Sequence, residues 1–172
     1  MNKAIFLDRD GIINETYVVA GKSYPPSCVE ALQLVKGIKE LLTLLSKEYL
    51  LIGITNQPDI SRGLQNWCEV ERINNYIKNK LPILEFFVCP HSDEDNCTCR
   101  KPKVGLFIQA VEKYDIDLSQ SFCVGDRWKD VEAGINAGCK TIWVDYGYIE
   151  KKPLNADYVV QSVKDILELN IF

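Results

Sequence analysis

Near its start the chain reads Lys3-Ala4-Ile5-Phe6-Leu7-Asp8-Arg9-Asp10-Gly11. The first five residues of this stretch are mostly apolar, and a short apolar run that stops at polar residues is typical of a buried strand in a parallel sheet. Ligands of open α/β sheets lie beyond the carboxyl ends of the strands, so we expect Asp8 and Asp10 at the mouth of a crevice. Residues two apart can both face that crevice, while Arg9 should point elsewhere.

Two carboxylates this close repel each other unless a cation lies between them. Mg²⁺ is the natural candidate, because it prefers oxygen ligands and is often held by one or two carboxylates together with a substrate phosphate. In such a site one aspartate can attack phosphorus while the other transfers protons. The alternative is a capped strand end with two solvated acids. A calcium loop is excluded, because Ile12 stands where a further oxygen ligand is needed.

The composition predicts one globular domain. The chain has 172 residues, of which 47% are hydrophobic, and this is enough for a single domain with a sizeable core over residues 1–172. A net charge of -4 provides no basic surface for nucleic acid, and no apolar run approaches the ~20 residues of a membrane span. The start leads directly into a strand, so we expect no signal peptide. We also expect a monomer.

Seven cysteines without a secretion signal favour a reducing compartment, so we expect a cytoplasmic protein. Four of the cysteines lie apart in the sequence and are interpreted as small buried hydrophobic residues: Cys28, Cys68, Cys123 and Cys139.

Strand and helix patterns alternate along the rest of the chain. Apolar runs predict four further strands, over 50–54, 85–89, 121–124 and 141–144. Helical patterns are present over 35–47, 67–80, 104–114, 130–137 and 160–169. The segment 12–34 has no clean period and is expected to form a long loop over the crevice. This alternation predicts an α/β fold, a three-layer sandwich around a central parallel sheet, with no insertion long enough for a separate cap domain.

Polar residues follow each predicted strand and should meet at one edge of the sheet. Thr55 ends the second strand, and Asp126 follows the fourth strand, with Asp130 four residues later. Basic residues at 100, 101 and 103 precede the third helix. A hydroxyl and a lysine can hold the non-bridging oxygens of a phosphoryl group, and a further carboxylate can complete a cation site. Each of these residues alone could have an ordinary role, such as a turn acid or a solvated lysine. Chance does not explain why all four positions fall at successive strand ends.

Four segments resemble the motifs of the haloacid dehalogenase (HAD) superfamily, subclass III, over essentially the whole chain. They are Phe6-Leu7-Asp8-Arg9-Asp10-Gly11, Thr55-Asn56-Gln57, Cys99-Arg100-Lys101-Pro102 and Val124-Gly125-Asp126. The resemblance implies a HAD-like Rossmannoid fold and a Mg²⁺-dependent phosphatase that acts through an aspartyl-phosphate.

The resemblance also implies the roles of single residues. Asp8 would be the nucleophile and Asp10 the general acid and base, while Thr55 and Lys101 would stabilise the phosphate. Asp8, the Asp10 carbonyl and Asp126 would bind Mg²⁺. We prefer Lys101 to Lys103 as the stabilising lysine, because the family's lysine directly follows the arginine.

The remaining three cysteines cluster with the only histidine of the chain: Cys89, His91, Cys97 and Cys99. Such a set is a standard tetrahedral zinc site, and zinc held by four protein ligands is structural. The spacing in this loop, 89–99, resembles that of the heptose 1,7-bisphosphate phosphatases and the related histidinol-phosphate phosphatases. The zinc loop would then orient Arg100 and Lys101 toward the crevice. The alternative is a group of free thiols.

The resemblance to the heptose enzymes implies a sugar bisphosphate substrate, cleaved at the 7-phosphate, for nucleotide-heptose supply in bacterial lipopolysaccharide. The residues expected to bind it are Asn56, Gln57, Arg62, Arg100 and Arg127. The loops 15–26 and 57–63 should hold the distal part of the substrate. Both depart from the heptose pattern, because 58–63 reads Pro-Asp-Ile-Ser-Arg-Gly and 15–17 reads Glu-Thr-Tyr.

Three alternatives remain open from the sequence. The first is a phosphatase of histidinol phosphate or another small phosphoester. The second is a non-catalytic, zinc-stabilised binding module on the same scaffold. The third is a signalling domain phosphorylated on an aspartate, which Asp10 speaks against because a general base shortens the life of an acyl phosphate.

Overall fold

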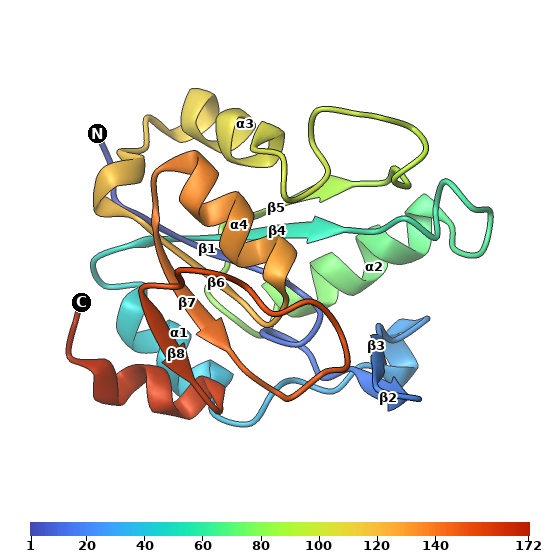
Figure 1. The fold of residues 1–172 in the computed structure, drawn as a ribbon, viewed down its shortest axis with the longest axis horizontal. Helices are drawn as coiled ribbons and strands as arrows, with labels where there is room; N and C mark the ends of the chain where they lie inside the picture. The colour runs from blue at the N-terminus through green and yellow to red at the C-terminus, as the bar shows by residue number, and fades with distance from the viewer.

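The centre of the molecule is a six-stranded sheet in which every neighbouring pair of strands is parallel, as the computed structural model of residues 1–172 shows (Figure 1). The strand order is β5-β4-β1-β6-β7-β8. The strands span β1 Ala4–Leu7, β4 Leu50–Asn56, β5 Glu85–Cys89, β6 Phe122–Gly125, β7 Lys140–Val144 and β8 Tyr158–Val160. The predicted α/β class and parallel sheet are therefore confirmed.

Helices cover both faces of the sheet and complete a three-layer sandwich (Figure 1). The α-helices are α1 Ile38–Leu45, α2 Trp67–Lys78, α3 Gly105–Tyr114 and α4 Trp128–Ala137, and the 3-10 helices are η1 Val29–Ala31, η2 Leu118–Gln120 and η3 Val163–Leu169. Because side chains alternate along a strand, β1 contributes to two cores. Ile5 and Leu7 pack with α1, α2 and η3, whereas Ala4 and Phe6 pack with α3 and α4.

The sixth strand, β8, was not predicted. The sequence predicts a helix over 160–169, and the structure has there the end of β8 and the 3-10 helix η3. The strand forms because Asp157, just before it, accepts hydrogen bonds from the backbone N–H (2.7 Å) and the hydroxyl (2.8 Å) of Thr141. The contact joins Thr141 and Asp157, which are 16 residues apart, and aligns β8 with β7. No local sequence pattern predicts it.

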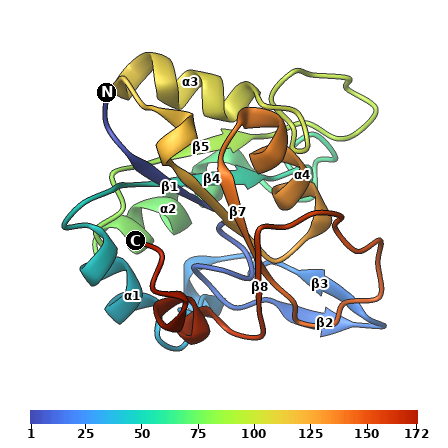
Figure 2. The ribbon, with the colours of Figure 1, turned by 60° about the vertical axis from the view of Figure 1, so that its left-hand side comes forward.

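The predicted loop 12–34 is more ordered than expected. It contains a hairpin of β2 Tyr17–Val19 and β3 Lys22–Tyr24, followed by η1. Figure 2 shows this hairpin beside the segment between β7 and β8, where the backbone N–H of Ile149 donates to the carbonyl of Gly21 at 3.0 Å. The hairpin is thus held by a distant part of the chain.

The interpretation of the isolated cysteines was half right. Cys123 and Cys139 are buried, whereas Cys28 is half-buried and Cys68 is exposed at the start of α2. No helix of the structure combines the length and the apolar character needed to cross a membrane.

Candidate active site

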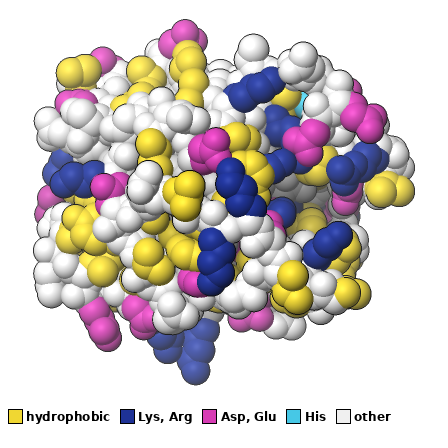
Figure 3. Space-filling view, viewed as in Figure 1, with side chains coloured by type: hydrophobic (Ala, Val, Ile, Leu, Met, Phe, Trp, Pro, Cys, Tyr) yellow, Lys and Arg dark blue, Asp and Glu magenta, His cyan; other side chains and the backbone are white.

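The predicted polar residues meet at the carboxyl edge of the sheet because the three strands that carry them are neighbours, in the order β4-β1-β6. Asp8 follows β1, Thr55 lies at the end of β4, and Asp126 follows β6. A cleft of about 480 Å³ opens there, lined by Asp8, Asp10 and Lys101 among others. Figure 3 shows Lys and Arg side chains gathered around a hollow in the right half of this face.

Lys101 is the central cation of the site and is only 2% exposed. Its Nζ lies 2.9 Å from Asp8 Oδ1 and 2.7 Å from Asp130 Oδ1, and it donates to the carbonyl of Ile54 at 2.8 Å. Burial alone would lower the pKa of Lys101, but the two carboxylates outweigh it and raise the pKa above its usual value. The lysine is therefore charged and fixed at the floor of the cleft.

Three carboxylates converge beside this lysine. Asp8, Asp126 and Asp130 are buried, and their oxygens lie within 4.8 Å of one another. Burial and the nearby Asp130 raise the pKa of Asp8 to about 7, although Lys101 opposes the shift. Burial and Asp8 likewise raise the pKa of Asp126 well above its usual value. Three carboxylates share the single positive charge of Lys101, and a divalent cation would balance the remaining negative charge.

Both carboxylate oxygens of Asp126 are buried without a hydrogen-bond partner. Buried carboxylates without partners are rare, because the loss of hydration is not offset. The donor set is all oxygen, so it suits Mg²⁺. The carboxylate also lies against Gly11, whose φ is +100°, and a Cβ there would be 2.0 Å from Asp126 Oδ2. Glycine at position 11 thus makes room for the acidic ligand.

Asp10 is held by a shell of donors that the sequence did not reveal. Arg9 was expected to point elsewhere, and it does not line the cleft, but its buried guanidinium turns back to Asp10. Arg9 NH2 lies 3.1 and 3.0 Å from the two carboxylate oxygens, and Arg9 NH1 donates to Asn74 Oδ1 at 3.1 Å. Asn14 donates to Oδ1 (3.0 Å) and Gln57 donates to Oδ2 (2.7 Å) of Asp10. Two features of the sequence could have indicated this contact. Arg9 lies between two aspartates, and Asn74 is a polar residue on the buried face of α2.

The Thr55-Asn56-Gln57 segment is connected to the catalytic residues by hydrogen bonds. Gln57 Nε2 donates to Thr55 Oγ1 at 2.8 Å as well as to Asp10. The Asn56 amide accepts from the backbone N–H of Lys101 at 3.0 Å and donates to its carbonyl at 3.1 Å. Asn56 and Gln57 both line the cleft, and in this structure their amides position Lys101 and Asp10.

The predicted substrate arginines lie around the opening of the cleft, each beside an acid. Arg62 pairs with Asp59 at 3.2 Å. Arg127 contacts Glu150 through two nitrogens, at 2.5 and 3.0 Å from Glu150 Oε2. The guanidinium groups are therefore oriented before any ligand arrives.

The Cys89-His91-Cys97-Cys99 group has the dimensions of a tetrahedral site. Five of its six ligand-atom pairs are separated by 3.2 to 3.7 Å, and none of the cysteines is in a disulfide. Ligands at the usual zinc distances are about 3.8 Å apart around a tetrahedron. The backbone N–H of Arg100 donates to Cys97 Sγ at 3.4 Å and lowers the pKa of Cys97 to about 7, against the effect of burial.

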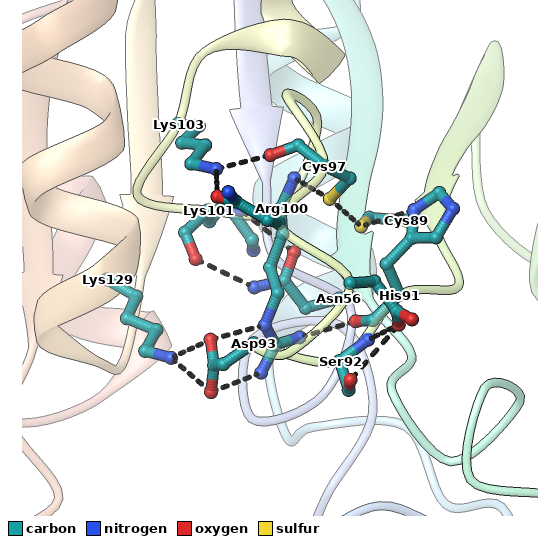
Figure 4. Close-up of polar contacts among 12 residues, drawn as sticks. Asn56, Cys89, His91, Ser92, Asp93, Cys97, Arg100, Lys101, Lys103 and Lys129 are labelled. Atoms are coloured by element: carbon teal, nitrogen blue, oxygen red, sulfur yellow. Dashed lines mark hydrogen bonds and ion pairs between the residues drawn. The ribbon is translucent and has the colours of Figure 1, made fainter.

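The loop that carries this group also orients Arg100 (Figure 4). Arg100 donates to Asp93 Oδ1 at 2.7 Å and to the His91 carbonyl at 3.2 Å, and Lys129 approaches the same Asp93 at 3.2 Å. The hydrogen bonds from Arg100 lower the pKa of Asp93 to about 2. Lys103 is exposed and bonds to the Cys97 carbonyl, which leaves Lys101 as the lysine at the catalytic carboxylates.

Comparison with known proteins assigns the family. A family model described as HAD-hydrolase-like matches residues 98–166. A D-glycero-beta-D-manno-heptose-1,7-bisphosphate 7-phosphatase of Helicobacter pylori is 42% identical over 98% of this chain and 95% of that protein. The chain belongs to this family of HAD-type phosphatases. Phosphatases of the HAD type use Mg²⁺ and an aspartyl-phosphate intermediate.

Two further members extend the comparison. A D-glycero-alpha-D-manno-heptose-1,7-bisphosphate 7-phosphatase of Campylobacter jejuni is 36% identical over 81% of this phosphatase and 80% of its own length. The crystal structure of D,D-heptose 1,7-bisphosphate phosphatase from B. bronchiseptica, complexed with magnesium and phosphate, superposes with a TM-score of 0.77 at 24% identity, covering 97% of both chains. That likeness shows the shared HAD fold.

Proposed function

We propose that this phosphatase removes the 7-phosphate of a D-glycero-D-manno-heptose 1,7-bisphosphate, in the supply of nucleotide-activated heptose for lipopolysaccharide. One observation carries the proposal that phosphoryl transfer takes place in this cleft. Asp8, Asp126, Asp130 and Lys101 converge in one buried cluster at the carboxyl edge of the sheet, and both carboxylate oxygens of Asp126 are buried without a hydrogen bond. The heptose substrate is proposed from the names of the relatives.

The first step is an in-line displacement at phosphorus. An oxygen of Asp8 attacks the 7-phosphate, the bond from phosphorus to the sugar oxygen breaks, and Asp10 gives that oxygen its proton. Lys101 and the Thr55 hydroxyl hold the non-bridging oxygens, where the charge of the transition state is spread. Asp10 lines the cleft, and hydrogen bonds from Arg9, Asn14 and Gln57 hold its carboxyl group there.

The second step is hydrolysis of the aspartyl-phosphate. Asp10, now ionised, takes a proton from a water molecule, which attacks phosphorus and releases Asp8 and inorganic phosphate. Arg9, Asn14 and Gln57 hold the Asp10 carboxyl group in position for this step through their hydrogen bonds. The two steps thus use opposite protonation states of one carboxyl group.

Asp8, the Asp10 carbonyl and Asp126 would hold Mg²⁺. The raised pKa values of Asp8 and Asp126 and the unpartnered oxygens of Asp126 support this assignment. When bound, Mg²⁺ supplies positive charge against which the phosphoryl oxygens and the nucleophile can approach each other. Asp130 is not assigned as a ligand, because both of its carboxylate oxygens already have partners. Lys101 contacts one of them, and the Arg127 backbone N–H donates to the other.

The proposal includes a structural Zn²⁺ in the loop 89–99 of a single domain over 1–172. Cys89, His91, Cys97 and Cys99 would be its four ligands, which leaves no open position for chemistry. Metal analysis of the purified protein should give one zinc per chain. The Cys99→Ser variant should lose it, while a variant at the exposed Cys68 should retain it.

The sugar and its second phosphate would contact the residues around the opening of the cleft, on a protein proposed to act as a monomer in the cytoplasm. Five predicted residues line this opening or the cleft beneath it: Asn56, Gln57, Arg62, Arg100 and Arg127. A guanidinium can bind two oxygens of a phosphate at once, but each of these arginines already pairs with a carboxylate.

Phosphate release from a substrate panel tests the function. Both anomers of heptose 1,7-bisphosphate, histidinol phosphate and unrelated phosphoesters should be compared, with and without Mg²⁺. We expect Mg²⁺-dependent release with a clear preference for the heptose bisphosphate, and no turnover by Asp8→Asn in a folded protein. Comparable turnover of unrelated esters would refute the heptose assignment. No release from any ester would favour the binding-module alternative.

A further inference from the structure

We propose that Lys22, on the hairpin of β2 and β3, binds the phosphate that stays on the substrate. The inference rests on the proposed function, in which the substrate carries one phosphate at each end of a seven-carbon sugar. Only one of the two can lie against Asp8, so the other must be bound elsewhere in the cleft. Lys22 and Asp8 line the same cleft, whose volume of about 480 Å³ is in the range that holds small-molecule ligands.

The charges of the cleft single out Lys22. Six basic side chains line it: Lys22, Arg62, Arg100, Lys101, Arg127 and Lys129. All but one form an ion pair with a carboxylate within 3.2 Å. Lys22 has neither an ion pair nor a hydrogen bond from its ammonium group. A phosphate must compete with a carboxylate at the other cations, whereas the full charge of Lys22 is available.

The hairpin is anchored in a way that keeps Lys22 at the cleft. Gly21, the residue before it, accepts the hydrogen bond from Ile149 at 3.0 Å, and the Ile149 side chain packs against the Gly21 Cα. At the other end of the hairpin the rings of Tyr17 and Tyr24 stack with centroids 5.7 Å apart. Lys22 therefore projects from an ordered support and not from a free loop.

The charge of Lys22 should favour the binding of bisphosphates over monophosphates. Loss of the Lys22 charge removes an attraction that only a substrate with a second phosphate can have, while the groups that react at Asp8 stay unchanged. An exposed ion pair of this kind is expected to change the KM by about fivefold and to leave kcat in place. Lys22 is thus proposed as a specificity residue with no part in the chemical step.

The test compares heptose 1,7-bisphosphate with heptose 7-phosphate, which differ only in the distal phosphate. Lys22→Gln should raise the KM for the bisphosphate about fivefold and leave the KM for the monophosphate and both kcat values unchanged. Lys22→Arg should restore the KM for the bisphosphate. The control is Lys36→Gln, because Lys36 is also exposed and without an ion pair but lies outside this cleft. It should change neither KM.

Three results would overturn the inference. They are an unchanged KM in Lys22→Gln, an equal rise of the KM for both substrates, and wild-type KM values that do not differ between the two substrates. In each case phosphate release by the wild type would still support the proposed function. A wild type that hydrolyses neither heptose phosphate would refute the proposed function, and the inference would fall with it.

Discussion

The floor and the opening of the cleft hold their charges in opposite ways. At the floor, Lys101 is buried between Asp8 and Asp130, with side chains that are 2%, 11% and 4% exposed. At the opening, Arg62 and Asp59 are 50% and 40% exposed. Removing one partner of a buried pair leaves an uncompensated charge and is costly, whereas an exposed pair contributes little. Changes at the floor should therefore destroy the reaction, and changes at the opening should alter the choice of substrate.

The largest effect is expected from Lys101→Met. The variant leaves two buried carboxylates without their cation, which should lower the free energy of unfolding by about 3–5 kcal/mol. We also expect a loss of kcat of up to about a thousandfold, since the phosphoryl charge loses its fixed counter-charge. Urea denaturation and phosphate release measure the two effects. Lys103→Met is the matched control, and similar damage there would contradict the distinction between floor and opening.

Arg9→Met should come next. The Arg9 guanidinium is buried and bonds both oxygens of Asp10. Without it the general acid and base loses its orientation, and we expect kcat to fall about a hundredfold. Arg62→Met, at the opening, should raise KM and keep kcat. Steady-state kinetics of both variants decide the point, and a KM effect alone in Arg9→Met would contradict the positioning of Asp10.

Gly11→Ala tests the space beside Asp126. The added Cβ would lie 2.0 Å from Asp126 Oδ2, at a φ of +100° that alanine avoids. We expect Mg²⁺ to bind at least about tenfold more weakly, because the ligand must move. Gly63→Ala is the control, since its φ is +70° but no atom lies within 4 Å of the added Cβ. Its cost should be limited to about 1 kcal/mol of unfolding free energy. Calorimetric titration with Mg²⁺ distinguishes the two.

The pH dependence of Mg²⁺ binding follows from Asp8. Its pKa is raised from 3.8 to about 7, so the metal-free folded state binds a proton more tightly than the unfolded state does. The stability from this group is full below pH 4 and is lost as the pH rises toward 7. Mg²⁺ competes with the proton, so its addition should raise the melting temperature more at pH 8 than at pH 5.5. Equal shifts at both pH values would contradict the carboxylate cluster as the binding site.

The smallest effect is expected from Asp93→Asn, at the opening. Asp93 contacts both Arg100 and Lys129 but is largely exposed, so the stability should change by less than about 1 kcal/mol. The pKa of Asp93 is lowered to about 2, which means that its contribution is present above pH 4 and is lost only as the pH falls through 2. Thermal melts of both proteins at pH 7 should therefore nearly coincide. A large loss of stability would place Asp93 with the floor.

The sequence was most informative for site residues whose position depends only on the strand that carries them. Asp8, Thr55 and Asp126 could be placed together because parallel strands carry their carboxyl ends to the same edge. Contacts made by side chains across the fold were not predictable. Arg9 turns back to Asp10 and also donates to Asn74 of α2, and the three-residue strand β8 follows Asp157, which bonds to β7. Contacts of this kind leave no regular pattern in the sequence, because they form only when distant elements pack together.

Lys101 also has a mechanical consequence. Its single nitrogen touches the carboxylate after β1, the backbone of β4 and the first turn of α4, while its own backbone is paired with the Asn56 amide. This nitrogen thus links three segments that lie far apart in the sequence to the loop that carries Lys101. The loops around the opening of the cleft can change in length or sequence without altering these contacts of Lys101. The scaffold can therefore acquire new substrates by changing its outer loops, while this nitrogen stays where it is.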